Sequence, residues 1–359
     1  MALWRLLLGL ESLLGGGGAE GWRVTVLRLQ AELASEAFRA RWKEISHLQI
    51  EDTSANPESH PASDLWLAAS LPRIARRLRA DVLYSPAFLS PPHTPGLTRL
   101  VMVHDDLPWS QPASYPAAFR YYLRAGTRLA VRSADRVLFP SRDAARRAGN
   151  RLRIPGKRRA VLPHAVDPDI HFPAPLEGRS PTVLCIANAE RRKNHEVLLR
   201  AFGDPAGLPA GGLELVFAGF PASAGARLAE LRRTPCAVPW RPVEIPDDRE
   251  LAEAVRRAAV LVLPSRGEGF GLPVLEAMAC GTPLVLSDLP VLREVAGEAG
   301  VYLDPDDGDG WRREVLLAME GGPDVRRRVA AGIERARNAT PRRLARRFLR
   351  LCAGTPVRS

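Results

Sequence analysis

Two glutamates and a glycine-rich stretch stand between two apolar runs in the second half of the chain. Glu268 follows the run 260–264, and Glu276 comes eight positions later, after Pro273. Proline suits the first turn of a helix, so we expect a helix over 273–280. Glycines let a backbone approach a ligand closely, and free N–H groups at a helix start favour phosphate. The stretch predicts a phosphate-binding loop formed by Gly269, Phe270, Gly271 and Leu272.

The two carboxylates of this stretch suit the hydroxyl groups of a sugar nucleotide. Each hydrogen bond to an ionised carboxylate contributes about 1.5–3 kcal/mol. Glu268, in the loop, is placed to face a sugar ring, and Glu276, in the helix, to reach a ribose. Taken alone, such a pair also fits a solvated loop glutamate and a second one that favours the helix dipole. The complete order of strand, glycine loop, helix and strand favours ligand binding.

A basic pair follows the first predicted strand of the second half. Arg192 and Lys193 lie between an expected strand over 182–187 and an expected helix over 194–202. A guanidinium and an ammonium at that place suit the two phosphates of a departing diphosphate. The alternative is a solvated basic loop in an arginine-rich chain. Because Lys193 is one of only three lysines, we favour the functional interpretation.

Strands and helices that position these residues alternate through most of the chain. Such alternation predicts parallel sheets covered on both faces, with ligands beyond the carboxyl ends of the strands. We expect strands over 24–29, 81–85, 99–104, 136–140, 160–163, 182–187, 214–218, 260–264, 283–287 and 301–303. We expect helices over 6–14, 65–79, 117–132, 141–152, 194–202, 224–233, 250–259, 273–280, 311–319 and 342–351.

The stretch 260–287 resembles glycosyltransferase family 4, whose members are retaining enzymes of the GT-B fold. Glu268 and Glu276 match the family's Glu-x7-Glu motif, and the resemblance continues through 287–297 and 301–306. The fold it implies is α/β, with two Rossmann-like, doubly wound parallel-sheet domains facing across a cleft. It also implies that Glu268 contacts the transferred sugar and Glu276 the nucleotide ribose.

Further roles follow from the same resemblance. Arg192 and Lys193 would bind the donor diphosphate, and Gly219 would lie in the nucleotide-side loop. His104, at the end of the strand over 99–104, would help position sugar and acceptor, although a structural pair of His104 with Asp105 is an equal alternative.

The proline-rich stretch 167–181 predicts the connection between the domains. We expect an acceptor-binding domain over 1–172 and a donor-binding domain over 173–338. A C-terminal helix within 339–359 is expected to pack back toward the first domain.

This chain departs from the family pattern at three places. Ala187-Asn188 stands where many members carry Gly-Arg, so Arg192 must supply that charge. Residues 243–246 lack the usual glycine-aromatic pattern, which leaves the base open. The order at the start is a helix over 6–14, a flexible Gly15–Gly18 connector and a strand over 24–29, so we expect the family's first strand and glycine loop to be absent.

Composition limits the cellular locations and the classes of binding partner that this protein can have. The net charge is +11, but nearly all of the 51 basic residues are arginine, which favours a compositional bias over a nucleic-acid site. Neither a recognition helix nor clustered aromatics support nucleic-acid binding. No run approaches the roughly 20 apolar residues of a membrane span, and the four cysteines are dispersed. We expect a cytoplasmic protein, with peripheral contact at the inner membrane face as the second interpretation of the charge.

The resemblance is closest to the family's mannosyltransferase-like group 1 branch. It implies transfer of a hexosyl unit, with mannose favoured and with retention, from a GDP- or UDP-sugar to a hydroxyl group of a polysaccharide or lipid-linked glycan. No cofactor and no metal are expected, because Arg192, Lys193 and the helix start offset the diphosphate charge. The three Asp-x-Asp pairs (167/169, 304/306 and 307/309) are the alternative, a divalent metal site. The rival function is a non-catalytic sugar-nucleotide-binding partner subunit.

Overall fold

Six parallel strands form the larger sheet, in the order β12-β11-β10-β7-β8-β9. The chain begins this sheet with β7, adds β8 and β9 on one side, and then adds β10, β11 and β12 on the other. This is the doubly wound order, and its switch point lies between β7 and β10. The strands are β7 (Ser180–Ile186), β8 (Glu214–Ala218), β9 (Trp240–Val243), β10 (Ala258–Leu263), β11 (Leu284–Ser287) and β12 (Gly300–Leu303).

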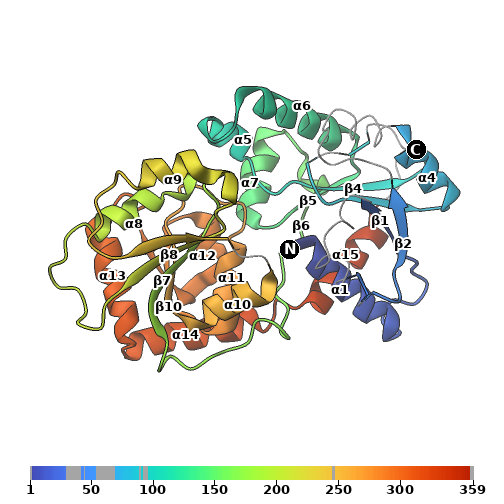
Figure 1. Ribbon diagram of the computed structural model, residues 1–359. Helices are drawn as coiled ribbons and strands as arrows, with labels where there is room; N and C mark the ends of the chain where they lie inside the picture. Colours follow the sequence, from blue (N-terminus) through green and yellow to red (C-terminus); the bar gives the residue numbers. More distant parts are fainter. Residues whose placement is uncertain are drawn as a thin grey trace. The chain divides into compact units, whose positions relative to one another are not determined.

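Helices cover both faces of this sheet because its central strands are apolar on both sides (Figure 1). One face packs against α10, α11, α12 and α14, and the other against α8, α9 and α13. The helices are α8 (His195–Ala201), α9 (Gly225–Leu231), α10 (Asp248–Arg257), α11 (Leu272–Cys280), α12 (Pro290–Ala296), α13 (Gly308–Glu320) and α14 (Pro323–Ala336).

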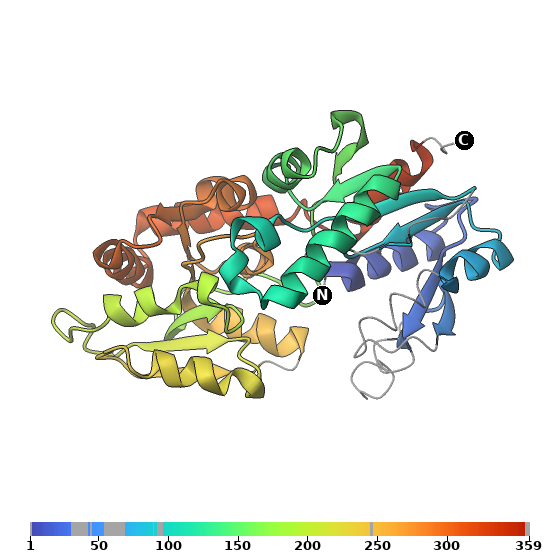
Figure 2. The ribbon, with the colours of Figure 1, turned by 90° about the horizontal axis from the view of Figure 1, so that it is seen from above.

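A second parallel sheet has the order β3-β4-β5-β6, and β1 and β2 form a separate parallel pair. Helices α6 and α7 pack on one face of the four-stranded sheet, and α1 and α15 on the other (Figure 2). The strands are β1 (Thr25–Leu29), β2 (Gln49–Thr53), β3 (Val82–Ser85), β4 (Thr98–Met102), β5 (Arg136–Phe139) and β6 (Arg159–Val161). The helices are α1 (Ala2–Gly15), α4 (Leu71–Arg77), α5 (Leu107–Ser110), α6 (Ala117–Ser133), α7 (Arg142–Arg151) and α15 (Pro341–Ala353).

The last helix packs on the first. Leu6 and Leu10 of α1 share a core cluster with Leu344 and Phe348 of α15. Gly9 permits this close approach, because a Cβ at this position would lie 2.0 Å from the Pro341 carbonyl oxygen. The apolar face of α15 is therefore buried against α1, although more than 300 residues separate the two helices along the chain.

The computed structural model describes residues 2–29, 42–43, 45–53, 69–88, 90–91, 96–244 and 247–355. The chain forms two compact units. The first comprises Met1–Pro108, Pro116–Ala165 and Pro341–Ser359, and the second Trp109–Tyr115 and Val166–Thr340. The prolines predict the change of domain at residue 172, whereas the structure places it at Ala165–Val166. No helix in the described ranges is both long and apolar enough to cross a bilayer.

All ten predicted strands and nine of the ten predicted helices are confirmed within a few residues. For the tenth, expected over 65–79, the structure has α4, and residues 65–68 lie outside the described ranges. As predicted, α1 and a glycine turn precede β1. The pattern did not predict β2, β9, α5, α12 or α14. Strand β2 contains Glu51 and Asp52, and β9 contains Arg241 and Pro242, which only an edge strand accommodates well.

Candidate functional site

The predicted donor residues lie in the loops that follow β7 and β10, the two strands at the switch point of the larger sheet. Arg192 and Lys193 belong to the short 3-10 helix η4 (Arg191–Lys193) after β7, and Glu268 lies in the loop after β10. Strands β7 and β10 pair in parallel, so both loops leave the same edge. Ligands of doubly wound sheets bind at this place, because neighbouring loops there diverge to opposite faces.

Asn194 fixes the basic loop in place. Its backbone is left-handed, with φ 57°, which asparagine tolerates better than most residues. Its buried side chain donates hydrogen bonds to the carbonyl oxygens of Pro264 (3.2 Å) and Pro305 (2.7 Å). One amide therefore joins the loops that follow β7, β10 and β12. The backbone N–H of Arg266 also donates to the Arg192 carbonyl oxygen at 2.8 Å.

Lys193, Arg192 and Glu268 form one nearly buried charge cluster. The Lys193 Nζ donates to Glu268 Oε1 at 2.7 Å, and Arg192 Nη1 lies 3.7 Å from Glu268 Oε2. Arg192 Nη1 also donates to the Gly267 carbonyl oxygen at 2.9 Å. The structure thus brings together three of the four residues predicted to be catalytic. They meet because β7 and β10 are neighbouring parallel strands, so the loops that follow them lie side by side.

The electrostatics of the cluster keep its groups charged. Burial by itself would raise the pKa of Glu268, but Lys193 and Arg192 outweigh it and lower that pKa below its ordinary value. Burial would lower the pKa of Arg192, but the carboxylates of Glu268 and Glu190 raise it overall. The carboxylates of Glu190 and Glu268 therefore hold the two cations, Arg192 and Lys193, at the strand ends.

Glu190 is a member of this cluster that the sequence did not predict. Its Oε2 accepts a hydrogen bond from Arg192 Nε at 2.5 Å, and its Oε1 accepts one from the Asn188 side-chain amide at 2.6 Å. Asn188 stands where many family members have arginine. Glu190 stands two positions before Arg192, and this spacing was the only sign that they could pair. It could not predict the contact, because the contact depends on the path of the loop.

Glu276 lies in the first turns of α11, as predicted, and is buried. His171 Nε2 lies 3.9 Å from Glu276 Oε1, and His171 is buried as well. His171 comes from the proline-rich stretch that we interpreted as a connection, so no sequence signal pointed to it. The Asp167 carbonyl oxygen lies 3.3 Å from His171 Nδ1 and orients the ring.

The predicted phosphate loop ends at a left-handed glycine. Gly271 is the N-cap of α11, with φ 90°, and a Cβ there would lie 2.8 Å from Leu292 Cδ2. Phe270 packs partly against the core, and Gly269 and Leu272 are half-buried. Gly219 follows β8 with φ 100°, and its N–H donates to the Val243 carbonyl oxygen at 2.8 Å. Their predicted contacts with a donor stay predictions.

His104 lies in the first unit, after β4. Its Nε2 is 2.9 Å from the Pro86 carbonyl oxygen, and its ring lies 5.8 Å from Phe88 and 6.0 Å from His164. Burial, together with the charges of His104 and Arg5, lowers the pKa of His164 to about 3. Asp105 accepts a hydrogen bond from the Leu107 N–H at 2.9 Å. The role of His104 toward the donor sugar stays a prediction.

The aspartate pairs that could hold a metal have structural contacts. Asp306 forms a two-pronged ion pair with Arg266, and Asp307 caps α13 through the Gly310 N–H at 2.9 Å. Asp167 Oδ1 accepts a hydrogen bond from the Asp169 N–H at 3.1 Å. Within the described ranges, no group of three or more His, Cys, Asp or Glu side chains is arranged to hold a metal ion.

Family models match both units of the chain. A model described as glycosyl transferases group 1 matches residues 180–320, and one described as Glycosyltransferase Family 4 matches residues 10–170. The chain belongs to glycosyltransferase family 4. The predicted family is thus confirmed, and the two sheets together are the GT-B fold.

Curated relatives match parts of this family 4 chain. The O-antigen chain mannosyltransferase B of Escherichia coli is 44% identical over 73 residues, which is 20% of this chain and 19% of that protein. A D-inositol 3-phosphate glycosyltransferase of Geodermatophilus obscurus is 32% identical over 225 residues, which is 54% of this chain and 48% of that protein. The chain spans about half, or less, of the length of these relatives.

Solved structures share the fold over nearly the whole chain. HepE of Anabaena, in complex with UDP and glucose, has a TM-score of 0.72 at 16% identity and covers 98% of this chain and 95% of its own. Sucrose-phosphate synthase of Thermosynechococcus elongatus has a TM-score of 0.72 at 18% identity, with 96% and 92% covered. At these identities the likeness supports the GT-B fold alone.

Proposed function

We propose that this chain transfers a hexosyl unit, most readily mannose, from a GDP- or UDP-sugar to a hydroxyl group of a polysaccharide or lipid-linked glycan. The observation that carries the proposal is the cluster of Lys193, Arg192 and Glu268 at the switch point of the larger sheet. Two cations held beside a carboxylate at a strand edge suit a diphosphate joined to a sugar. The mannosyltransferase relatives support mannose, and the UDP and glucose bound by HepE support a nucleotide-sugar donor.

Donor binding exchanges charge partners within the cluster. The diphosphate competes with Glu268 for Lys193, while Glu190 keeps its hydrogen bond to Arg192 Nε and orients that side chain, and the start of α11 adds a positive dipole. Glu268, released from Lys193, accepts hydrogen bonds from sugar hydroxyls, and Glu276 accepts those of the ribose. Because two protein cations offset the leaving group, the proposed transfer needs no metal ion.

The proposed transfer retains the anomeric configuration. The bond from the sugar C1 to the diphosphate oxygen breaks, and a bond from C1 to the acceptor oxygen forms on the same face. The acceptor proton passes to the leaving diphosphate, whose charge Arg192 and Lys193 stabilise as it develops.

Thermal unfolding with GDP, UDP and ADP, followed by donor hydrolysis and transfer assays, tests the proposal. A preferred nucleotide at 100 times its Kd stabilises the fold by about 2.7 kcal/mol, which is a readily measured rise in Tm. Stabilisation by none of the three would contradict donor binding. Binding without hydrolysis or transfer would favour the rival function, a sugar-nucleotide-binding partner subunit.

We also propose peripheral contact with an anionic membrane surface through α6. This helix carries four arginines and no acidic residue. Tyr121 (63% exposed), Leu129 (49%) and Phe119 (37%) project from it into solvent. Exposed aromatic and aliphatic side chains beside arginines favour the interface of an acidic bilayer. Cosedimentation with vesicles containing phosphatidylglycerol, but not with pure phosphatidylcholine vesicles, is expected, and Tyr121→Ser with Leu129→Ser is expected to abolish it.

A further inference from the structure

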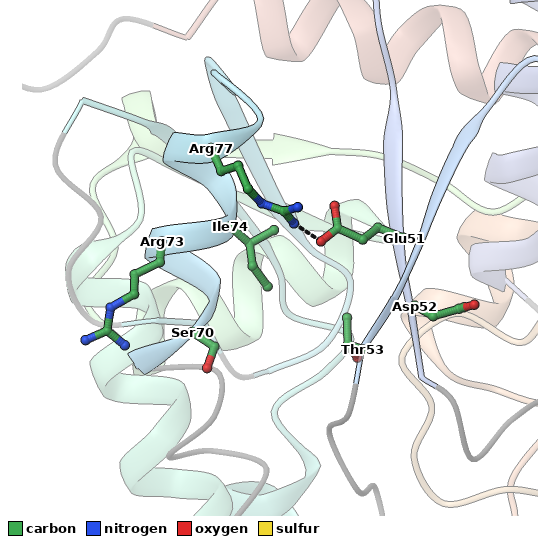
Figure 3. Close-up of a pocket in the computed structure, with 7 residues that line it drawn as sticks. All are labelled: Glu51, Asp52, Thr53, Ser70, Arg73, Ile74 and Arg77. Atoms are coloured by element: carbon green, nitrogen blue, oxygen red, sulfur yellow. Dashed lines mark hydrogen bonds and ion pairs between the residues drawn. The ribbon is translucent and has the colours of Figure 1, made fainter.

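A pocket of about 420 Å³ lies in the first unit, between the end of β2 and one side of α4 (Figure 3). Arg77 of α4 pairs with Glu51 of β2 across it, as the dashed line in Figure 3 marks, whereas Asp52 and Arg73 point away. Because Glu51 and Arg77 neutralise each other, the pocket leaves neither of these charges for a ligand.

A buried histidine lies beside Glu276 in the second unit. His171 Nε2 is 3.9 Å from Glu276 Oε1, and the two side chains are 1% and 2% exposed. With so little of its surface open, Glu276 can meet a ribose from few directions only, so the direction of its carboxylate decides whether the contact forms. Water screens groups at this depth little, so a charged or donating neighbour at this distance favours one direction of the carboxylate.

The backbone on both sides of this histidine is held by Arg256 of α10. Arg256 Nη1 donates to the Ile170 carbonyl oxygen at 2.6 Å, and its Cζ lies 4.2 Å from the centre of the Phe172 ring. The Ala174 N–H donates to the Cys280 carbonyl oxygen at 3.1 Å, which ties the same stretch to the end of α11. The histidine therefore has a defined place beside α11, although it lies outside the helices and strands.

The hydrogens of the ring follow from its two neighbours. The Asp167 carbonyl oxygen, 3.3 Å from His171 Nδ1, can only accept a hydrogen bond, so Nδ1 carries a hydrogen in this contact. An ionised carboxylate also only accepts, so the ring complements Glu276 when Nε2 carries a hydrogen as well, as it does in the imidazolium form. The ring then directs one donor at the backbone and the other toward Glu276.

We infer that His171 is a positioning residue for the nucleotide: it turns the Glu276 carboxylate toward the ribose hydroxyls. This inference rests on the proposed function, because it gives Glu276 the ribose contact proposed there. His171 acts through Glu276 and touches no part of the donor. Its removal is therefore expected to matter only when the carboxylate and the ribose hydroxyls are both present.

Calorimetric titration of His171→Ala tests the inference. The ligands are GDP or UDP, whichever binds the unchanged chain more tightly, and the 2′,3′-dideoxy analogue of that nucleotide. We expect the Kd for the ordinary nucleotide to rise about fivefold, a part of what a charged hydrogen bond contributes, and the Kd for the analogue to stay the same. His171→Gln, whose amide N–H donates from the place of Nε2, is expected to recover most of the affinity.

A double-mutant cycle separates positioning from a general effect on the fold. In a chain that already carries Glu276→Gln, His171→Ala is expected to cause no further loss, because the carboxylate that it orients is gone. Glu177→Ala, at an exposed residue of the same proline-rich stretch, is the control and is expected to bind both ligands like the unchanged chain. In donor hydrolysis, His171→Ala is expected to raise KM and to leave kcat at saturating donor unchanged.

Four results would overturn the inference: unchanged binding by His171→Ala, equal losses for the nucleotide and its analogue, a further loss in the double variant, or no recovery in His171→Gln. A general loss of folding would appear as the second of these. Failure of the proposed function would look different, because the unchanged chain would then bind neither nucleotide, and the inference would fall with it. If the inference alone fails, the chain still distinguishes ribose from dideoxyribose, and does so equally without His171.

Discussion

The Glu190 carboxylate holds the Arg192 guanidinium by its Nε, at 2.5 Å, while Nη1 of the same arginine reaches the Gly267 carbonyl oxygen across the switch point. Arg192 is therefore clamped from the loops after both β7 and β10. The same Nη1 lies 3.7 Å from Glu268 Oε2, so the two contacts set the direction in which Arg192 presents its charge.

Glu190→Gln tests this clamp. The amide keeps the shape but removes the charge, so we expect the kcat/KM for the donor to fall about tenfold, the equivalent of one charged hydrogen bond. The measurement is steady-state donor hydrolysis. Glu334→Gln, which removes a surface glutamate paired with Arg337, is the control and is expected to change nothing. Equal activity of the two variants would rule out an orienting role for Glu190.

Lys193→Ala removes the ammonium that is proposed to stabilise the leaving diphosphate. Loss of one such group commonly lowers kcat by about 100-fold or more. We expect that loss in transfer and in hydrolysis, with no unfolding at the assay temperature as judged by circular dichroism. Lys157→Ala, at an exposed lysine of the first unit, is the control. A Lys193→Ala enzyme with unchanged kcat would contradict the assignment.

Glu276→Gln tests the predicted contact with the ribose. We expect the Kd for the preferred nucleoside diphosphate to rise at least about tenfold, because a charged hydrogen bond becomes a neutral one. Calorimetric titration should also use the 2′,3′-dideoxy nucleotide, which lacks the hydroxyls in question. For that analogue the variant and the unchanged chain are expected to bind alike. A loss of equal size for both nucleotides would mean that Glu276 acts through the fold or through His171.

Glu11 gives the first unit a pH-dependent contribution to stability. Burial raises its pKa, but hydrogen bonds from Ser46 and His47 outweigh burial and lower that pKa from 4.5 to about 2. Its Oε1 accepts the Ser46 N–H and the His47 N–H, both at 2.8 Å. Because the folded-state pKa is the lower one, the contribution is complete above about pH 4.5 and is lost as the pH falls toward 2.

Urea unfolding of Glu11→Gln and the unchanged chain, at pH 7 and pH 3, measures this effect. We expect the variant to be about 1–3 kcal/mol less stable at pH 7 and the gap to narrow at pH 3. Glu20→Gln, at an exposed site, is the control. A gap that is independent of pH would show that the carboxylate charge does not contribute.

The sequence predicted the segment from β10 to α11 well because every requirement there is local. A buried strand, glycines around Glu268, Pro273 at the helix start and Gly281 at its end each act within a few residues. Arg192 and Lys193 were likewise predicted correctly to follow β7, because the strand before them and the helix after them are both marked by local sequence. Parallel pairing of β7 and β10 then brought the two loops together, as the doubly wound order requires.

Contacts that depend on the path of a loop could not be predicted. His171 reaches Glu276 from an irregular stretch, and Asn194 bonds to two carbonyl groups that are 70 and 111 positions away. Strand β2 was not predicted because Glu51 and Asp52 lie in a two-stranded sheet and outside the buried core. No periodicity marks such positions, since their environment is set by other parts of the chain.

The packing of α15 against α1 has a consequence for biosynthesis. Residues 2–15 leave the ribosome before residues 341–353, so the apolar stripe of α1 stays uncovered until α15 has been made. The second unit, continuous from Val166 to Thr340 apart from one short segment made earlier, is complete by then. We therefore expect nascent chains that stop before Pro341 to hold a folded second unit and a first unit that binds chaperones.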